Sequence, residues 1–216
     1  MARSTSNLDS IAARMRAGLS SKHSAREKAL QLSREAIYHC ATAIRALHRG
    51  EFEAAQPLLE GARSRLAEIG QALVGHEDIL YSGYVHDAQK EYAEACATLA
   101  LIQGKPLPEP EALGVPYSAY LNGLGEAVGE MRRHLLDALR QGQVSRCEEL
   151  LEGMDDIYTV LVTMDFPDAL TGGLRRTTDM VRGVVERTRG DLTLALRQQE
   201  LEQRLETFEG RLKGLP

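Results

Sequence analysis

The sequence has no tryptophan, and aromatic residues make up only 5% of its 216 residues. Its hydrophobic core must therefore be built almost entirely from aliphatic side chains. Strand-forming runs are nearly absent, because proline and glycine separate long segments rich in Ala, Leu, Glu, Arg and Gln. This composition is typical of an all-α protein.

Cysteine is also scarce, and the three residues of this kind, Cys40, Cys96 and Cys147, form no C-x-x-C pair. This number and spacing indicate neither a disulfide framework nor a zinc site. No stretch of about 18 apolar residues is present, so no membrane span is expected. The first ten residues lack the apolar run of a signal peptide, and a cytoplasmic protein is therefore expected.

Positive charge is sparse in most of the chain but concentrated at its beginning. The net charge is −5, yet residues 1–50 hold nine Lys and Arg against three Asp and Glu, whereas the remainder holds 17 against 28. The chain as a whole is therefore not a basic nucleic-acid-binding protein, although its first helices can still present one basic face. The alternative is that these charges only solvate helix surfaces.

Apolar periodicity and turn residues predict seven helices in one bundle-like domain spanning residues 1–216. Ser24 and Glu27 have the spacing of a capping box, as do Ser145 and Glu148, so each pair is expected to begin a helix. Residues 104–116 hold four prolines and are predicted to form an extended connection within the domain. The expected helices cover approximately residues 4–19, 24–49, 52–73, 76–103, 116–141, 145–164 and 168–210, the last with an interruption near Gly172 and Gly173.

Residues 120–135, YLNGLGEAVGEMRRHL, have the length and apolar spacing of a helix but hold three glycines. Each glycine inside a helix costs about 1 kcal/mol relative to alanine. On a helical wheel, Glu126 and Glu130 fall on one stripe with Gly123, nearly opposite the apolar face. Small residues let another helix approach closely, so the glycines are expected to bring these two carboxylates next to the preceding long helix.

That preceding helix, residues 76–103, carries a matching acidic face on which Asp87, Glu91 and Glu94 lie one turn apart. Two carboxylates from each of two helices make an oxygen-rich site, which suits Mg²⁺ or Mn²⁺. Such a cation lowers the pKa of bound water and neutralises charge on a phosphodiester. Zinc and a ferritin-like di-iron centre are disfavoured because suitably spaced His residues are lacking. The alternative is an ordinary solvated acidic face.

Four segments, taken in order, resemble the translin superfamily over nearly the whole chain. They are REKALQLSREAIYHCATAIRALHRGEFEAA (26–55), DAQKEYAEACATLALIQGKPLP (87–108), AYLNGLGEAVGEMRRHLLDAL (119–139) and RGDLTLALRQQELEQRL (189–205). The resemblance implies a translin-like all-α bundle. In this family, translin itself binds nucleic acid without catalytic carboxylates, translin-associated factor X is the catalytic partner in an RNA-degrading complex, and prokaryotic members combine both roles.

The family's acidic motifs fall on Glu91 and Glu94 in KEYAEA and on Glu126 and Glu130 in GEAVGEM. In translin-associated factor X the first residue of the second pair is typically Asp, so Glu126 keeps the charge on a side chain one methylene longer. All four positions are acidic, which implies the catalytic branch. The resemblance thus implies an endoribonuclease that binds one or two Mg²⁺ or Mn²⁺ ions through these residues and cleaves single-stranded RNA. A non-catalytic, translin-like RNA- or DNA-binding protein and a structural helical scaffold are the alternatives.

The resemblance also implies a homo-octameric shell that holds nucleic acid inside. Single-stranded DNA is a further candidate ligand. The residues expected to face RNA belong to the basic first helices and are Arg26, Lys28, Arg34, Arg45, His48 and Arg49. A second basic group is explained about as well by helix packing or by ion pairs between subunits, and consists of Arg175, Arg176, Arg182, Arg187 and Arg189.

Overall fold

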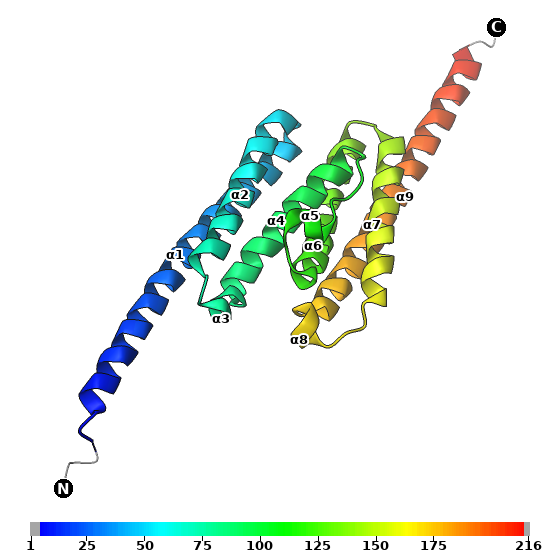
Figure 1. The fold of residues 1–216 in the computed structure, drawn as a ribbon. Helices are drawn as coiled ribbons and strands as arrows, with labels where there is room; N and C mark the ends of the chain where they lie inside the picture. Colours follow the sequence, from blue (N-terminus) through cyan, green and yellow to red (C-terminus); the bar gives the residue numbers. More distant parts are fainter. Residues whose placement is uncertain (1–4, 214–216) are drawn as a thin grey trace. The chain divides into compact units, whose positions relative to one another are not determined.

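The computed structural model describes residues 5–213, and every regular element in that range is a helix. The predicted all-α fold is therefore confirmed. Six long helices and three of a single turn follow one another in this range (Figure 1). In chain order they are α1 (Leu8–His48), α2 (Phe52–Ala72), α3 (Glu77–Leu80), α4 (Gly83–Ile102), α5 (Pro110–Leu113), α6 (Tyr117–Arg140), α7 (Val144–Thr163), α8 (Asp168–Thr171) and α9 (Leu174–Lys213).

The chain divides into two compact units, Met1–Tyr92 and Ala93–Pro216. The division falls within α4, which is a continuous helix. The single domain expected from the sequence stays a prediction. Within residues 5–213, no helix is both long enough and apolar enough to cross a membrane.

The first unit is built on the pairing of α1 with α2. Aliphatic side chains from α1, α2, α3 and the start of α4 form its core, among them Leu32, Ile69 and Val85. Close approach of α1 and α2 depends on Gly61, because a Cβ at that position would lie 3.2 Å from the ring of His39. The basic residues of α1 are thus carried by a helix whose opposite face is packed.

The second unit packs α6, α7 and α9 against one another (Figure 1). Its core joins Ala97 near the end of α4 to Val128 and Met131 of α6, Leu161 of α7 and Val181 of α9. The proline-rich connection contains the single turn α5 and is tied back to α6 by the Tyr120 hydroxyl, which donates to the Pro108 carbonyl oxygen at 2.8 Å. The helix that carries Glu126 is therefore the central element of this unit.

Both predicted capping boxes are wrong. Helix α1 runs without a break through Ser24, because residues 19–24 contain neither proline nor glycine to end it and serine is tolerated inside a helix. Helix α7 begins at Val144, directly after Gln143, so Ser145 already lies inside the helix. A serine followed three residues later by glutamate predicts a helix start only where the backbone leaves the helical conformation.

Two predicted helices are divided by short breaks. The expected helix 76–103 is interrupted at Tyr81 and Ser82, which separate α3 from α4. The expected interruption near Gly172 and Gly173 is present, since these residues adopt φ of 63° and 81° and separate α8 from α9. Two consecutive residues in this left-handed region are easily accommodated only by glycine.

Candidate metal centre and nucleic-acid interface

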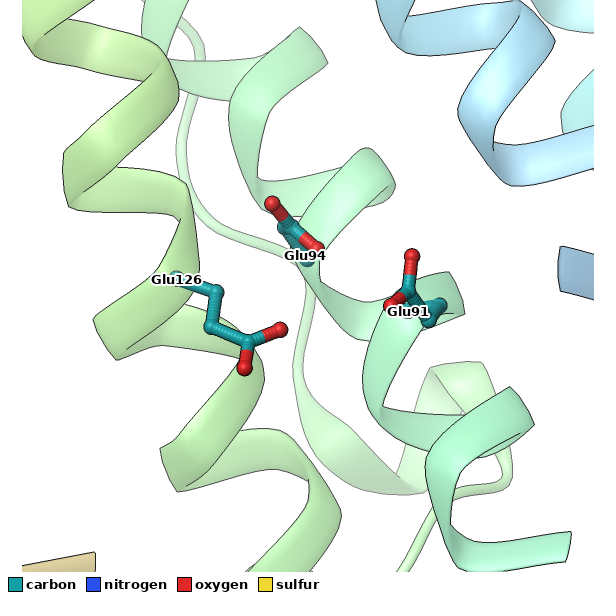
Figure 2. Close-up of side chains that lie close together, drawn as sticks. All are labelled: Glu91, Glu94 and Glu126. Atoms are coloured by element: carbon teal, nitrogen blue, oxygen red, sulfur yellow. The ribbon is translucent and has the colours of Figure 1, made fainter. Parts of the chain in front are cut away.

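Three of the predicted acidic residues lie together, Glu91 and Glu94 on α4 and Glu126 on α6 (Figure 2). Each offers a carboxylate oxygen within 4.8 Å of those of the other two. Glu94 is only 8% exposed, and the other two are half-buried. Because α4 is continuous, one helical turn sets the spacing of Glu91 and Glu94. These three residues are called the acidic trio below.

Carboxylates this close repel one another when ionised, and partial burial strengthens the repulsion because the surroundings screen charge less well than water. A divalent cation would relieve it. The donors are all oxygens, as Mg²⁺ and Mn²⁺ prefer. An octahedral Mg²⁺ holds opposite ligand oxygens about 4.2 Å apart and adjacent ones about 3 Å apart, so the flexible glutamate side chains would draw closer together around it. The acidic trio therefore fits such a cation.

The fourth predicted ligand stands apart from this group. Glu130 lies one turn beyond Glu126 on α6, is half-buried, and does not belong to the acidic trio. Asp87, one turn before Glu91, is exposed and is also outside the group. The trio is thus the part of the predicted site that the fold brings together, and the assignment of Glu130 as a ligand stays a prediction.

Two of the three glycines of α6, Gly125 and Gly129, do not have the packing role expected of them. A Cβ on Gly125 would lie 2.3 Å from Cγ2 of Thr177, so this glycine lets α6 pack closely against α9. A Cβ on Gly129 would have nothing within 4 Å beyond its own helical neighbourhood. The expectation that these two glycines admit α4 is therefore wrong. Gly125 instead lies on the side of α6 that packs against α9.

Asn122, one turn before Glu126, ties α6 to α8 and α9. Its buried side-chain amide donates to the carbonyl oxygens of Ser118 and Thr171 at 2.8 and 2.7 Å. Its Oδ1 accepts a hydrogen bond of 2.6 Å from the Thr177 hydroxyl. A buried amide with both ends engaged permits little rotation of the helix that carries it. Sequence reasoning missed this residue, whose one signal is a polar side chain among the leucines and glycines of LNGLG.

The end of α4 is held by an arginine from α7. Arg146 donates to the carbonyl oxygens of Leu101, at 3.2 Å, and of Ile102. It also pairs with Glu149 at 2.7 Å. The last carbonyl groups of a helix lack partners within the helix and carry its partial negative charge. Arg146 supplies hydrogen-bond donors to these carbonyl groups and a positive charge beside them, and so fixes the helix on which Glu94 lies.

Five of the six predicted RNA-facing residues lie on α1, and Arg49 directly follows its last residue. All six are exposed except His48, which is half-buried. Arg26 pairs with Glu27, and Arg45 donates to the Thr42 hydroxyl at 2.9 Å. Within residues 5–213, Lys28 and Arg34 make no ion pair. The structure thus leaves these two cations open to a charged ligand.

Arg49 has the firmest local partner of this set. It donates two hydrogen bonds to Glu51, at 2.9 and 2.6 Å, which raise the pKa of Arg49 and lower that of Glu51. An exposed ion pair of this kind contributes little to stability, because water screens the two charges. Arg49 could therefore leave Glu51 and pair with a phosphate group at little cost in free energy.

Members of the second basic group make ion pairs inside their own unit. Arg189 of α9 pairs with Asp155 of α7 at 2.9 Å and so links two packed helices. Arg175 and Arg182 lie 3.7 and 3.8 Å from Asp165 and Asp179, respectively. For Arg189, helix packing is the reading that the structure favours.

Comparison with known proteins gives the following matches, although no protein-family model matches the chain. The structure of AfC3PO in complex with duplex RNA has a TM-score of 0.80 and 34% sequence identity, covering 86% of this chain and 96% of that one. The crystal structure of AfC3PO has a TM-score of 0.78 and 33% identity, with the same coverage.

Two more distant matches agree with these. The crystal structure of apo-NeC3PO has a TM-score of 0.71 and covers 88% of this chain and 97% of that one, but its 19% identity supports the fold alone. The uncharacterized protein MJ0175 of Methanocaldococcus jannaschii is 28% identical over 196 residues, which are 88% of this chain and 85% of that protein.

Proposed function

Since the chain belongs to the translin superfamily, we propose that it is a metal-dependent endoribonuclease, a hydrolase of RNA phosphodiester bonds. The observation that carries this proposal is the acidic trio, in which three carboxylates from two helices approach within 4.8 Å. Such a group is expected in a catalytic member of the family and is not needed in a protein that only binds nucleic acid.

Glu91, Glu94 and Glu126 would hold the cation, Mg²⁺ or Mn²⁺, with Glu130 as an additional ligand from the family motif. When bound, such a cation supplies an activated water and neutralises charge on phosphate oxygens. The protein's own contribution is placement. Asn122 and Gly125 fix α6 and Arg146 fixes the end of α4, and small misplacements in a catalytic site lower rates strongly.

The basic side of α1 would bind the RNA backbone. Its exposed cations can each neutralise a phosphate, which makes binding strongly salt-dependent. AfC3PO forms a complex with duplex RNA, and this supports RNA as the ligand class here. We propose single-stranded RNA as the cleaved form, single-stranded DNA as a further ligand, and a homo-octameric shell as the assembly.

A cleavage assay tests the proposal directly. Labelled single-stranded and duplex RNA are incubated with wild-type protein and with Glu126→Gln, each in Mg²⁺ and in EDTA. Cleavage by the wild type in Mg²⁺ alone, lost in Glu126→Gln while RNA binding is kept, is the expected result. The Gln side chain has almost the same size, so the comparison isolates the negative charge.

The assay also separates the main alternative. Binding of RNA without cleavage in every condition would overturn the nuclease proposal and place the chain with the non-catalytic, translin-like binding proteins. Cleavage that persists in Glu126→Gln would remove the acidic trio from the reaction.

A further inference from the structure

Helix α1 carries one Tyr, Phe or Trp residue, Tyr38, and that side chain is 65% exposed. Its ring meets the His39 ring of the same helix edge to face, with centroids 6.1 Å apart and an angle of 66° between the ring planes. A single exposed aromatic residue is ordinary on a protein surface and assigns no role by itself. The residues on either side of Tyr38 give it a context that points to a ligand.

Two arginines lie along the same side of α1 as Tyr38. At about 100° per residue, Arg34, Tyr38 and Arg45 fall within about 40° of one another around the helix, and all three are exposed. At a rise of about 1.5 Å per residue, Arg34 lies about 6 Å before Tyr38 and Arg45 about 10 Å beyond it. An aromatic ring thus stands between two cations on one stripe, which is called the Tyr38 stripe below.

Local contacts keep positive charge at this stripe. The Thr42 hydroxyl donates to the Tyr38 carbonyl oxygen at 2.7 Å, and Arg45 donates to the same hydroxyl at 2.9 Å, so Arg45 is drawn back towards the turn that carries the ring. Glu35, the carboxylate next to Arg34 in the sequence, pairs with Arg65 of α2 at 2.9 Å. The carboxylate nearest in the sequence is therefore already neutralised from the other helix.

Binding sites for single-stranded nucleic acid combine cations that contact the backbone with aromatic side chains on which bases stack. We propose that the Tyr38 stripe binds an unpaired base of RNA, with the base stacked on the Tyr38 ring and the neighbouring phosphates held by Arg34 and Arg45. Because every base presents a π-face, the site accepts any sequence. This inference rests on the RNA binding proposed for α1 and not on cleavage.

The Tyr38 stripe would discriminate by strand form. Inside a duplex, both faces of a base are covered by its neighbours, so the Tyr38 ring meets no free face unless a base is first unstacked at a cost in free energy. Phosphates are present in both forms, so the two arginines can contact either. Stacking is therefore the part of the interaction that favours single strands, the form proposed above as the substrate.

Tyr81 supplies a matched control from the same unit. Its side chain is 83% exposed, but residues 76–86 around it contain neither Lys nor Arg and include Glu77 and Asp78. Removing its ring takes away a similar exposed aromatic surface without touching a basic stripe.

Binding affinity tests the stacking contact. Labelled single-stranded RNA and its duplex are titrated in EDTA, which removes the metal that cleavage is proposed to need. Tyr38→Ala should bind the single strand about tenfold more weakly and the duplex as tightly as the wild type. Tyr38→Phe, which keeps the ring, and Tyr81→Ala should bind both forms normally. The slope of log K against log[salt] should stay the same in Tyr38→Ala, because no phosphate contact is lost.

A fluorescent base reports the contact itself. The fluorescence of 2-aminopurine falls when this base stacks on an aromatic ring, and the chain has no tryptophan to interfere with the signal. A short oligomer of uridine with one central 2-aminopurine should lose fluorescence when it is saturated with wild-type protein. The loss should be smaller with Tyr38→Ala at saturation.

The outcomes separate the stacking site from the proposed function. Unchanged affinity of Tyr38→Ala for the single strand, an equal loss for the duplex, or equal quenching by Tyr38→Ala and the wild type would overturn the stacking site and leave the nuclease proposal intact. Absence of RNA binding by the wild type would overturn both. Binding that depends on Tyr38 in a protein that cuts no RNA in Mg²⁺ would support the stacking site and remove the nuclease proposal.

Discussion

Helices α1 and α6 present charge in opposite ways. On α6, Glu126 is half-buried on a segment fixed by Asn122 and Gly125. On α1, Lys28 and Arg34 extend from an exposed surface and, in the described part of the chain, form no ion pair. A cation site needs carboxylates at set positions, whereas a polyanion can be bound by mobile side chains, since phosphates repeat along its length. In the proposed function, the fixed carboxylates would therefore serve the chemistry and the exposed cations would serve RNA binding.

The largest expected effect comes from changing a carboxylate of the acidic trio. Glu94→Gln should lower the single-turnover rate of RNA cleavage by at least about 100-fold, because it removes a buried ligand of the proposed cation. Glu130→Gln should cost less, since Glu130 lies outside the acidic trio. RNA affinity and the circular dichroism spectrum serve as controls. Equal losses in the two variants would show that four carboxylates act together.

The next largest effect is expected at the contact between α6 and α9, which holds the helix that carries Glu126. Gly125→Ala should lower the free energy of unfolding by about 1–3 kcal/mol, because the new Cβ overlaps Cγ2 of Thr177. Thr177→Ser removes that methyl group and keeps the hydroxyl that donates to Asn122. The double variant should therefore recover most of the loss in urea unfolding. An equal deficit in the double variant would mean that another contact is responsible.

The exposed cations of α1 are tested by removing the two that form no ion pair in the described part of the chain. Lys28→Ala with Arg34→Ala should weaken binding of single-stranded RNA and reduce the slope of log K against log[salt] by about 1.4, since each phosphate contact on a single strand contributes roughly 0.7 to that slope. The cleavage rate of bound RNA should not change. Arg175→Ala with Arg182→Ala removes the same charge elsewhere and is the control. A slope that falls equally in both variants would argue for a diffuse charge effect.

The smallest effect is expected at Gly129, which can be compared with Gly125 on the same helix. Gly129→Ala should raise the free energy of unfolding by up to about 1 kcal/mol, because the new Cβ meets no neighbour and alanine favours the helix. Urea unfolding beside Gly125→Ala provides the measurement. A loss of stability at position 129 would place an unrecognised contact there.

Much of the fold was predictable because long apolar periodicities determine which segments become helices. The all-α fold follows from such patterns, and the break at Gly172 and Gly173 follows from the pair of glycines itself. Local signals were less dependable. The motif at Ser24 looks like a helix start, but residues 19–24 contain no proline or glycine and the helix continues through them.

The candidate site was predictable in part. Helical spacing indicates that Glu91 and Glu94 share one face and that Glu126 and Glu130 share another, and the family resemblance implies the same four residues. Which of them approach one another depends on the rotation of α6, which the sequence does not specify. That rotation is set by Thr177 and Thr171, which lie about fifty residues along the chain from Asn122 and contact it only in the folded protein.

The hydrogen bond from Asn122 to the carbonyl of Thr171 has a consequence for local unfolding. Helix α8 has four residues and is too short to persist alone. Because its last carbonyl is held by α6, opening α8 exposes a buried amide of α6 as well. The two helices should therefore open as one cooperative unit. Amide hydrogens in α8 should exchange with solvent at the slow pace of α6, and a change at Asn122 should release them first.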